Sequence, residues 1–552
     1  MSLRSLTVQA AWRFAAAPAA ARFRRALADP ERTQRRILCS VVGRNGSTRF
    51  GREHDFRSID SVEGFRERVP VRTYDELKPW IDAAADGEPG VLTCDPISAF
   101  LPTSGTSSGR KLIPWTASLH REFEEAIHPW VHGFMRGCPG AWRGRAYWAL
   151  SPPSWPGDRT GGGIPIGFAA DTSYLAGFLR PLVSASLAVP SEVAALRDTV
   201  DWNYVTLAFL LAAADLSMIS IWSPTFLTTL VEPLAAWWPR LLHDLENGTL
   251  SPPGGARTRL PQLARQFGRH ASRAGTLRGH SSCDFAAIWP QLAGISCWTD
   301  AAARDPSREL ARLFPRAKIV GKGLVATEGI VSIPVPGASS PALAVTSHFL
   351  EFIGDDGSVC GAWELSEGRE YSVVLTTGGG LYRYRLNDRI RVTGFTDRCP
   401  LVEFMGREGA ACDLCGEKLA EPFVRSCLDR AAGKIGATWS FALLAPAASA
   451  KPQYVLIVAG DDETDASRMA LALDEMLCQN VHYAHARRIG QLGSVRPVRL
   501  RCNAAEAWAR YQQRLASEGA RIGDIKPAAL DSRTGWEMVF ADSRSVSVEP
   551  AV

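Results

Sequence analysis

This chain of 552 residues lacks the features of fibrous, disordered or nucleic-acid-binding proteins. It has no low-complexity segments and no internal repeats. Its 62 Lys and Arg residues exceed its 57 Asp and Glu residues by five charges, too few to propose a nucleic-acid partner. The composition, 46% hydrophobic and 22% charged, is that of a soluble globular protein. At this length we expect two or more domains.

Long apolar runs are also lacking. The most apolar stretch, residues 205–216, is interrupted by Asp215 and followed by Ser223 and Pro224. A membrane-spanning helix needs about 20 apolar residues. The stretch is therefore predicted to be a buried helix followed by a strand, and we expect no membrane partner.

Cysteines in metal-binding patterns are scarce. The twelve cysteines are scattered, and Cys412 and Cys415 form one C-x2-C without a second pair or nearby histidines. Because structural zinc needs four ligands, two packed thiols are favoured there over zinc. Residues 1–25 resemble a transit peptide in being rich in Ala and Arg without acids, but their apolar residues favour a helix. With no secretory signal, we expect a cytoplasmic protein.

One segment, from Thr103 to Lys111, combines hydroxyl side chains, glycines and cations. Apolar residues precede and follow it, which predicts a strand, a loop and a second strand. Gly105 and Gly109 permit backbone angles that would strain other residues, so successive N–H groups can converge. The segment predicts an anion cradle suited to a polyphosphate. Its members are Thr103, Ser104, Gly105, Thr106, Ser107, Ser108, Gly109, Arg110 and Lys111.

This segment has one alternative interpretation and excludes another. A plain surface turn is the alternative, because Gly, Ser and Thr gather in many loops. The segment is not a Walker A loop, which requires Gly-x4-Gly-Lys-Ser/Thr. Here Gly105 and Gly109 are separated by three residues, and Lys111 is followed by Leu112.

Helical and strand-like segments alternate along the first 395 residues and indicate an α/β fold. A helix is expected at 118–135, and strands at 146–150, 218–222, 292–297, 317–320 and 331–334. Residues 342–395 form a β-rich section. We therefore predict a large mixed α/β N-terminal domain, residues 1–398, with a β-rich subdomain.

After residue 396 the pattern starts again. Strands are expected at 401–405, 440–444, 454–458 and near 495–500, with helices at 417–432 and 465–477. This order predicts a small α+β C-terminal domain, residues 399–552.

Two more stretches carry side chains suited to nucleotide chemistry. In 322–329, Lys-Gly-Leu-Val-Ala-Thr-Glu-Gly, Thr327 could bond a phosphate oxygen and Glu328 offers a hard ligand for Mg2+. In 381–388, Leu-Tyr-Arg-Tyr-Arg-Leu-Asn-Asp, the Asp388 carboxylate could clasp a ribose diol. Taken singly, a solvated Glu and a hairpin with an Asx-type turn are the alternatives.

In this order, the stretches resemble the adenylate-forming superfamily, and more narrowly its auxin-responsive Gretchen Hagen-type acyl acid amido synthetases. Residues 103–111 are similar to that family's phosphate loop. Residues 381–388 match its Leu-Tyr-Arg-Tyr-Arg-x-Gly-Asp signature except at Asn387. Residues 48–54, 221–226 and 295–300 add to a resemblance that extends from about residue 30 to about residue 530.

The resemblance implies that ATP activates a carboxylic acid as acyl-AMP, and that an amine, often an amino acid, then takes the acyl group. It implies that loop 103–111 holds phosphates, with Lys111 taking part in catalysis. Thr327 would touch the α-phosphate, Glu328 would bind Mg2+, and Asp388 would take the ribose.

The resemblance also implies that the C-terminal domain is a lid. Arg407 is similar to the superfamily's hinge-proximal arginine, and Lys526 to the catalytic lid lysine that neutralises the α-phosphate. Leu324 replaces a Tyr that the plant members place against adenine, so adenine would be held by apolar packing or by another aromatic residue.

An acyl-CoA ligase and a non-catalytic nucleotide-binding protein are the alternative functions. Trp148, Trp155 and Phe168 flank the expected acyl pocket and favour an aromatic or extended apolar acid, unless they are core residues. The motifs specify neither the acid nor the amine nor the oligomeric state.

Overall fold

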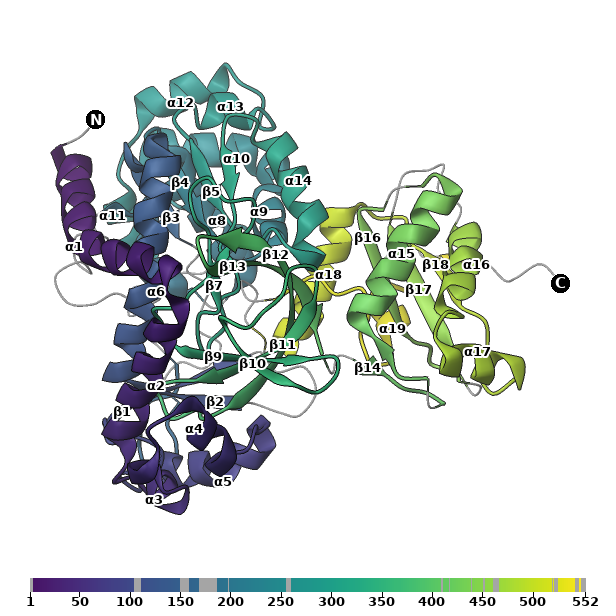
Figure 1. The fold of residues 1–552 in the computed structure, drawn as a ribbon. Helices are drawn as coiled ribbons and strands as arrows, with labels where there is room; N and C mark the ends of the chain where they lie inside the picture. The colour runs from purple at the N-terminus through teal and green to yellow at the C-terminus, as the bar shows by residue number, and fades with distance from the viewer. Residues whose placement is uncertain are drawn as a thin grey trace. The chain divides into compact units, whose positions relative to one another are not determined.

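The computed structural model describes most of the chain, in two compact units (Figure 1). The larger unit comprises Met1–Trp222, Pro233–Asp300 and Leu310–Phe404, and the smaller comprises Ser223–Glu232, Ala301–Glu309 and Met405–Val552. The division falls inside strand β13 (Cys399–Arg407). The domain boundary between 398 and 399 stays a prediction. The described residues are 3–103, 111–148, 158–167, 186–196, 198–254, 260–408, 411–415, 417–437, 439–449, 452–459, 466–518, 520, 525–541 and 546–547.

Helices make up much of the larger unit. The N-terminal helix and the buried helix expected within 205–216 are both confirmed, as α1 and α8. The helices are α1 (Leu3–Ala28), α2 (Pro30–Asn45), α3 (Arg49–Glu53), α4 (Val62–Arg68), α5 (Tyr74–Ala85), α6 (Ala117–Gly137), α8 (Thr199–Ala212), α10 (Leu234–Asn247), α11 (Leu260–Phe267), α12 (Ala271–Arg278) and α13 (Phe285–Ile288).

A four-stranded parallel sheet lies among these helices (Figure 1). Its strands, in spatial order, are β3 (Arg145–Trp148), β4 (Leu216–Ser220), β5 (Gly294–Ser296) and β6 (Lys318–Val320). All three pairings are parallel, so the carboxyl ends of the strands meet at one edge. Each strand was predicted, although β3, β5 and β6 are shorter than the predicted segments and β4 begins two residues earlier.

A seven-stranded sheet forms the β-rich section of the larger unit. Its order is β10-β9-β11-β12-β13-β8-β7, and a separate hairpin, β1–β2, carries the predicted phosphate loop. One apolar core joins this sheet to the hairpin and to helices α2, α4 and α5. The strands are β1 (Ile97–Thr103), β2 (Lys111–Thr116), β7 (Ser332–Ile333), β8 (Ala342–Leu343), β9 (Phe349–Gly354), β10 (Val359–Gly361), β11 (Glu370–Thr376) and β12 (Tyr384–Thr396).

The smaller unit is an α+β layer structure, as predicted. Alternate residues of strand β17 (Tyr454–Ala459) enter two different apolar clusters: Leu456 belongs to one and Ile457 to the other. This period of two lets helices cover both faces of one sheet. The other elements are β14 (Ala411–Cys412), β15 (Leu419–Ala420), β16 (Phe441–Pro446), β18 (Arg496–Arg499), β19 (Val546–Ser547), α9 (Pro224–Val231), α15 (Glu421–Ile435), α16 (Ala466–Leu477), α17 (Val481–Arg488), α18 (Ala504–Ser517) and α19 (Trp536–Ala541). Helix α14 (Arg304–Leu313) begins in this unit's segment Ala301–Glu309.

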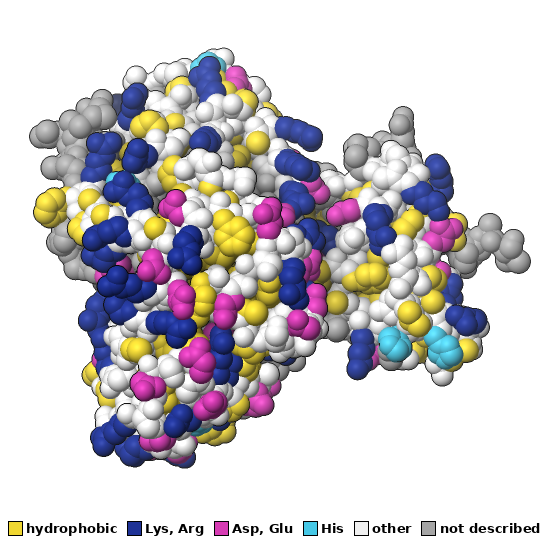
Figure 2. Space-filling view, in the orientation of Figure 1, with side chains coloured by type: hydrophobic (Ala, Val, Ile, Leu, Met, Phe, Trp, Pro, Cys, Tyr) yellow, Lys and Arg dark blue, Asp and Glu magenta, His cyan; other side chains and the backbone are white. Residues whose placement is uncertain are grey.

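The surface agrees with the nearly balanced composition. Basic and acidic side chains are interspersed over the face of the larger unit drawn in Figure 2. In the described part of the chain, no helix combines the length and apolar character needed to cross a membrane.

Candidate active site

The hairpin β1–β2 carries the ends of the predicted phosphate loop. Thr103 and Lys111 face each other as the last residue pair of the hairpin. The strand–loop–strand prediction is therefore confirmed at both flanks. Residues 104–110 lie outside the described residues. The phosphate roles of Ser104, Gly105, Thr106, Ser107, Ser108, Gly109 and Arg110 stay predictions.

Tyr74 fixes the outgoing strand of this hairpin. It opens helix α5, whose N-terminus is closed by a capping box between Thr73 and Glu76. Tyr74 Oη accepts a hydrogen bond from the Leu112 N–H at 2.8 Å, and burial raises the pKa of Tyr74. Lys111 Nζ lies 5.5 Å from the centroid of the Tyr74 ring. This cation–π distance holds the lysine at the base of the loop.

The residues just before α5 connect the hairpin to the 381–388 stretch. Arg72 donates its backbone N–H to Arg383 O at 2.9 Å and accepts one from the Arg385 N–H at 2.8 Å. These bonds form a parallel bridge between Arg72 and Tyr384. Two of the three motif stretches are thus joined through a short segment of the larger unit.

Thr327 and Glu328 occupy the central positions of a tight turn. Ala326 and Gly329, which flank them, exchange backbone hydrogen bonds of 3.0 and 3.3 Å. Glycine is required at 329 because a Cβ there would lie 2.9 Å from the His348 ring. The turn therefore presents Thr327 and Glu328 side by side.

Glu328 belongs to the interior and not to the surface. Its residue is only 2% exposed, and its Oε1 accepts a hydrogen bond from Tyr384 Oη at 3.3 Å. The alternative of a solvated glutamate is therefore wrong. This bond also joins the 322–329 stretch to the 381–388 stretch.

Asp388 lies in a bulge within strand β12. Ser372 pairs with Arg389 and Val374 pairs with Arg385, so one residue of β11 faces three residues of β12. Asn387 in this bulge has a left-handed φ of 63°, which Asn tolerates better than most residues. The alternative of a hairpin turn is wrong, because β12 continues to Thr396. Asp388 is 1% exposed, and bulges commonly re-aim side chains beside functional sites.

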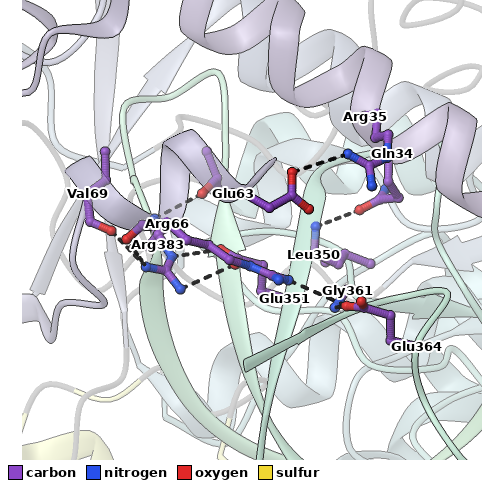
Figure 3. Close-up of polar contacts among 11 residues, drawn as sticks. Gln34, Arg35, Glu63, Arg66, Val69, Leu350, Glu351, Gly361, Glu364 and Arg383 are labelled. Carbon is purple, nitrogen blue, oxygen red and sulfur yellow. Dashed lines mark hydrogen bonds and ion pairs between the residues drawn. The ribbon is translucent and has the colours of Figure 1, made fainter. Parts of the chain in front are cut away.

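Arg383, the first arginine of the Tyr-Arg-Tyr-Arg stretch, has a structural role (Figure 3). Its Nε donates to Glu351 Oε2 at 2.9 Å, and its Nη1 donates to Val69 O at 2.8 Å. Arg66 Nε donates to the other Glu351 oxygen at 2.9 Å. The cluster holds Arg383 at a positive φ of 48°. It fixes the backbone just before Tyr384.

The remaining predicted residues fall into three groups. Arg407, at the end of β13, and Lys526, an exposed residue after α18, belong to the smaller unit. Leu324 is 4% exposed and packs in the core of the larger unit. Trp155 and Phe168 lie outside the described residues.

The described residues contain few side chains arranged to bind a metal. No cluster of three or more His, Cys, Asp or Glu side chains there could hold a metal ion. Cys412 is buried and Cys415 half-buried, and neither forms a disulfide. The Mg2+ assignment to Glu328 stays a prediction.

Sequence reasoning missed Tyr74, Tyr384 and Glu351. Tyr384 stands inside a recognised motif, so its position could have been noticed. Tyr74 and Glu351 are far from their partners in sequence, and only the fold brings them together.

Three family profiles match the chain in succession. They are described as the GH3 family N-terminal, central and C-terminal domains, and they match residues 19–319, 342–407 and 424–533. The first profile alone spans more than half of the chain.

Curated relatives and solved structures agree. Indole-3-acetic acid-amido synthetase GH3.4 of Arabidopsis thaliana is 26% identical, over 73% of this chain and 71% of its own length. Probable indole-3-acetic acid-amido synthetase GH3.1 of Oryza sativa subsp. japonica is 26% identical, over 94% and 90%. The acyl acid amido synthetase AtGH3.15 in complex with 2,4-DB superposes with a TM-score of 0.83 at 18% identity, covering 96% of each chain. A 2-hydroxyisobutyryl-CoA ligase shares the fold more distantly, with a TM-score of 0.51 at 14% identity over 81% of this chain and 83% of its own.

Proposed function

The chain belongs to the GH3 family, and on this premise we propose that it is an acyl acid amido synthetase. It activates a carboxylic acid with ATP and joins the acid to an amine, the expected amine being an amino acid. The observation that carries the proposal is the hydrogen bond from Tyr384 Oη to Glu328, which joins the 322–329 and 381–388 stretches inside one unit. The named GH3 relatives are amido synthetases.

The reaction has two steps. A carboxylate oxygen of the acid attacks the α-phosphorus of ATP, and the bond from that phosphorus to pyrophosphate breaks. The amine nitrogen then attacks the acyl carbon, the bond to AMP breaks, and the nitrogen loses a proton. Charge that builds on phosphate oxygens in the first step has to be offset by cations and N–H donors.

The proposed roles follow the motifs. Residues of loop 103–111 hold the phosphates. Lys111, which lies over the Tyr74 ring, contributes its positive charge. Thr327 bonds the α-phosphate, and Asp388 binds the ribose. Glu328 has the hard carboxylate oxygens that Mg2+ prefers, and Tyr384 occupies only one of their acceptor positions. When bound, Mg2+ would neutralise phosphate charge.

The smaller unit is proposed to act as the lid. Lys526 would neutralise the α-phosphate during adenylation, with Arg407 near the hinge. Lys526→Ala should slow acyl-AMP formation strongly, because a lost charge-stabilising donor costs about 3–4 kcal/mol. It should spare amide formation from synthetic acyl-AMP. Equal loss in both half-reactions would make Lys526 structural.

The reaction is expected in the cytoplasm. All twelve cysteines are free thiols, which suits a reducing compartment.

The decisive experiment is a pyrophosphate-release screen of carboxylic acids with MgATP. A positive acid is then supplied with amino acids or with CoA, and the products are identified by mass spectrometry. An acyl amino acid supports the proposal, and an acyl-CoA product would replace it with the ligase alternative. Tight ATP binding without pyrophosphate release under any condition would indicate a non-catalytic nucleotide-binding protein.

A further inference from the structure

The carboxyl edge of the parallel sheet gathers polar and aromatic side chains that the proposed reaction steps do not use. Trp148, Ser220, Ser296 and Val320 form one row in register across β3, β4, β5 and β6. Lys322 follows two residues after this row. Ligands of open α/β sheets bind outside the carboxyl ends of the strands. The row is therefore placed where a substrate pocket is expected.

Lys322 is a buried cation at this edge. It is 8% exposed, and its Nζ donates a hydrogen bond to Ser220 Oγ at 2.8 Å. The same Nζ lies 5.0 Å from the Trp130 ring centroid and 5.1 Å from that of Trp222. Within the described residues, no carboxylate forms an ion pair with it. Burial lowers the pKa of Lys322 to about 8.

Three further polar groups at this edge of the sheet lack partners. Trp130 Nε1, Trp148 Nε1 and Ser296 Oγ are buried, and none has a hydrogen-bond partner among the described residues. Ser296 and Trp148 flank Ser220 in register, and in-register residues of neighbouring strands point to the same face. Buried donors without acceptors are uncommon and costly. An ammonium, two indole N–H groups and a hydroxyl thus lie near this edge of the sheet, and three of the four have no hydrogen-bond partner among the described residues.

We propose that this cluster binds a second carboxylate of the acyl acid, so that the enzyme's substrates are dicarboxylic acids. The inference rests on the proposed function and names the substrate class of that site. A carboxylate offers about four acceptor positions, which match these donors. An aryl or alkyl monoacid would leave Trp130 Nε1, Trp148 Nε1 and Ser296 Oγ without a partner.

The bound carboxylate is the one that is not activated. An ammonium that stabilises the reacting carboxylate would strengthen the ground state and oppose its attack on phosphorus. The remote carboxylate keeps its charge through both steps, so its ion pair with Lys322 persists. The expectation of an aromatic or extended apolar acid stays, and this assignment adds a second carboxylate to it.

The test compares matched acids that differ by one carboxylate. Phenylacetic acid is paired with 4-carboxyphenylacetic acid, and straight-chain monoacids are paired with diacids of equal length. Pyrophosphate release by the wild type should favour the diacids by about tenfold or more in kcat/KM, the effect of one charged hydrogen bond. Equal or better use of the monoacids would overturn the proposal.

Variants test whether the preference for diacids depends on Lys322 and Trp130. Lys322→Met should lower kcat/KM for diacids by about tenfold or more and leave monoacids within about twofold. Trp130→Phe keeps the ring but removes the indole N–H, and should reduce diacid use alone by a few fold. Lys318→Met, at an exposed position on β6, is the matched control and should change neither. Equal losses for both acid classes in Lys322→Met would overturn the proposal.

A binding measurement separates this inference from the proposed function. Calorimetry with each acid, without ATP, should give tighter binding of the diacid to the wild type than to Lys322→Met. If no acid supports pyrophosphate release but this difference is found, the proposed function fails and the anion site stands. Adenylation of monoacids with no diacid binding would leave the function intact and exclude the site. If Lys322→Met does not fold, the wild-type preference within each acid pair decides.

Discussion

The stretches 322–329 and 381–388 have a similar order of charged residues, but their buried cations have different partners. Each contains a buried cation near its start and a buried carboxylate near its end: Lys322 and Glu328 in one, Arg383 and Asp388 in the other. Arg383 is neutralised by Glu351 in a buried ion pair. Lys322 is held by a hydroxyl and two tryptophan rings, with no carboxylate partner in the described part of the chain.

This difference indicates a structural role for Arg383 and a functional role for Lys322. A buried pair with its hydrogen bonds satisfied positions the backbone, as Arg383 does before Tyr384. A buried charge without a counterion lowers stability, and such local conflicts are expected at functional sites. The comparison therefore predicts that removing the partner of Arg383 lowers the free energy of unfolding and that removing the charge of Lys322 raises it.

The largest effect is expected from breaking the ion pair of Arg383 and Glu351. Glu351→Gln leaves Arg383 buried without a counterion, and removing one partner of a buried pair costs about 3–5 kcal/mol. The midpoint of urea unfolding, followed by tryptophan fluorescence, should fall accordingly. Asp82→Asn breaks the half-exposed pair of Lys78 and Asp82 and is the matched control, with no measurable change expected. An unchanged midpoint in Glu351→Gln would mean that the cluster is not structural.

Removing the charge of Lys322 is expected to increase stability. Burial lowers the pKa of Lys322 from its ordinary 10.5 to about 8. One pKa unit corresponds to 1.36 kcal/mol, so holding this proton costs the folded protein about 3 kcal/mol at pH 7. Lys322→Met removes the cost and should raise the unfolding free energy by about that amount, even though it impairs diacid use.

The pH dependence of the stability difference between Lys322→Met and the wild type tests whether the buried charge is its cause. The unfolded chain binds more protons than the folded protein between about pH 8 and pH 10.5, so wild-type stability rises with pH in that window relative to Lys322→Met. The advantage of the variant should be full below pH 8 and vanish above about pH 10.5. Among the described residues, the other titratable group that acts on Lys322 is the Cys297 thiol, whose pKa burial raises to about 12. An advantage that does not change with pH would assign the gain to packing.

The sequence predicted the elements well, because apolar runs and turn residues are local signals. Strands β3 to β6, the 117–137 helix and the α+β order of the smaller unit follow from them. The roles within the motifs were less predictable. Arg383 and Lys322 are both cations inside motif stretches, and only the fold brings Glu351 to one of them and tryptophans to the other. Burial of Glu328 and the bulge at Asp388 likewise depend on contacts between residues distant in sequence.

The two buried carboxylates can be tested separately. Asp388→Ala should weaken AMP binding by about tenfold or more, because each charged hydrogen bond to the ribose is worth about 1.5–3 kcal/mol. Isothermal titration calorimetry measures this. Asp355→Ala, which removes an exposed carboxylate paired with neighbouring Arg389, is the matched control and should bind AMP normally. Since Asp388 is only 1% exposed, equal affinity for both proteins would make it a structural residue of the bulge.

The smallest effect concerns the bond that joins the two stretches. Tyr384→Phe removes the donor to Glu328 Oε1 and should cost about 1 kcal/mol, the net worth of an average hydrogen bond. If Glu328 binds Mg2+, a less firmly held carboxylate should raise the Mg2+ concentration for half-maximal pyrophosphate release by about fivefold and leave the KM of the acid unchanged. Glu328→Gln and the double variant complete a cycle, and non-additive effects of the two changes are expected because the residues are in contact. Additive effects would mean that the two stretches are neighbours without being coupled, and an unchanged Mg2+ requirement in every variant would remove Glu328 from the metal site.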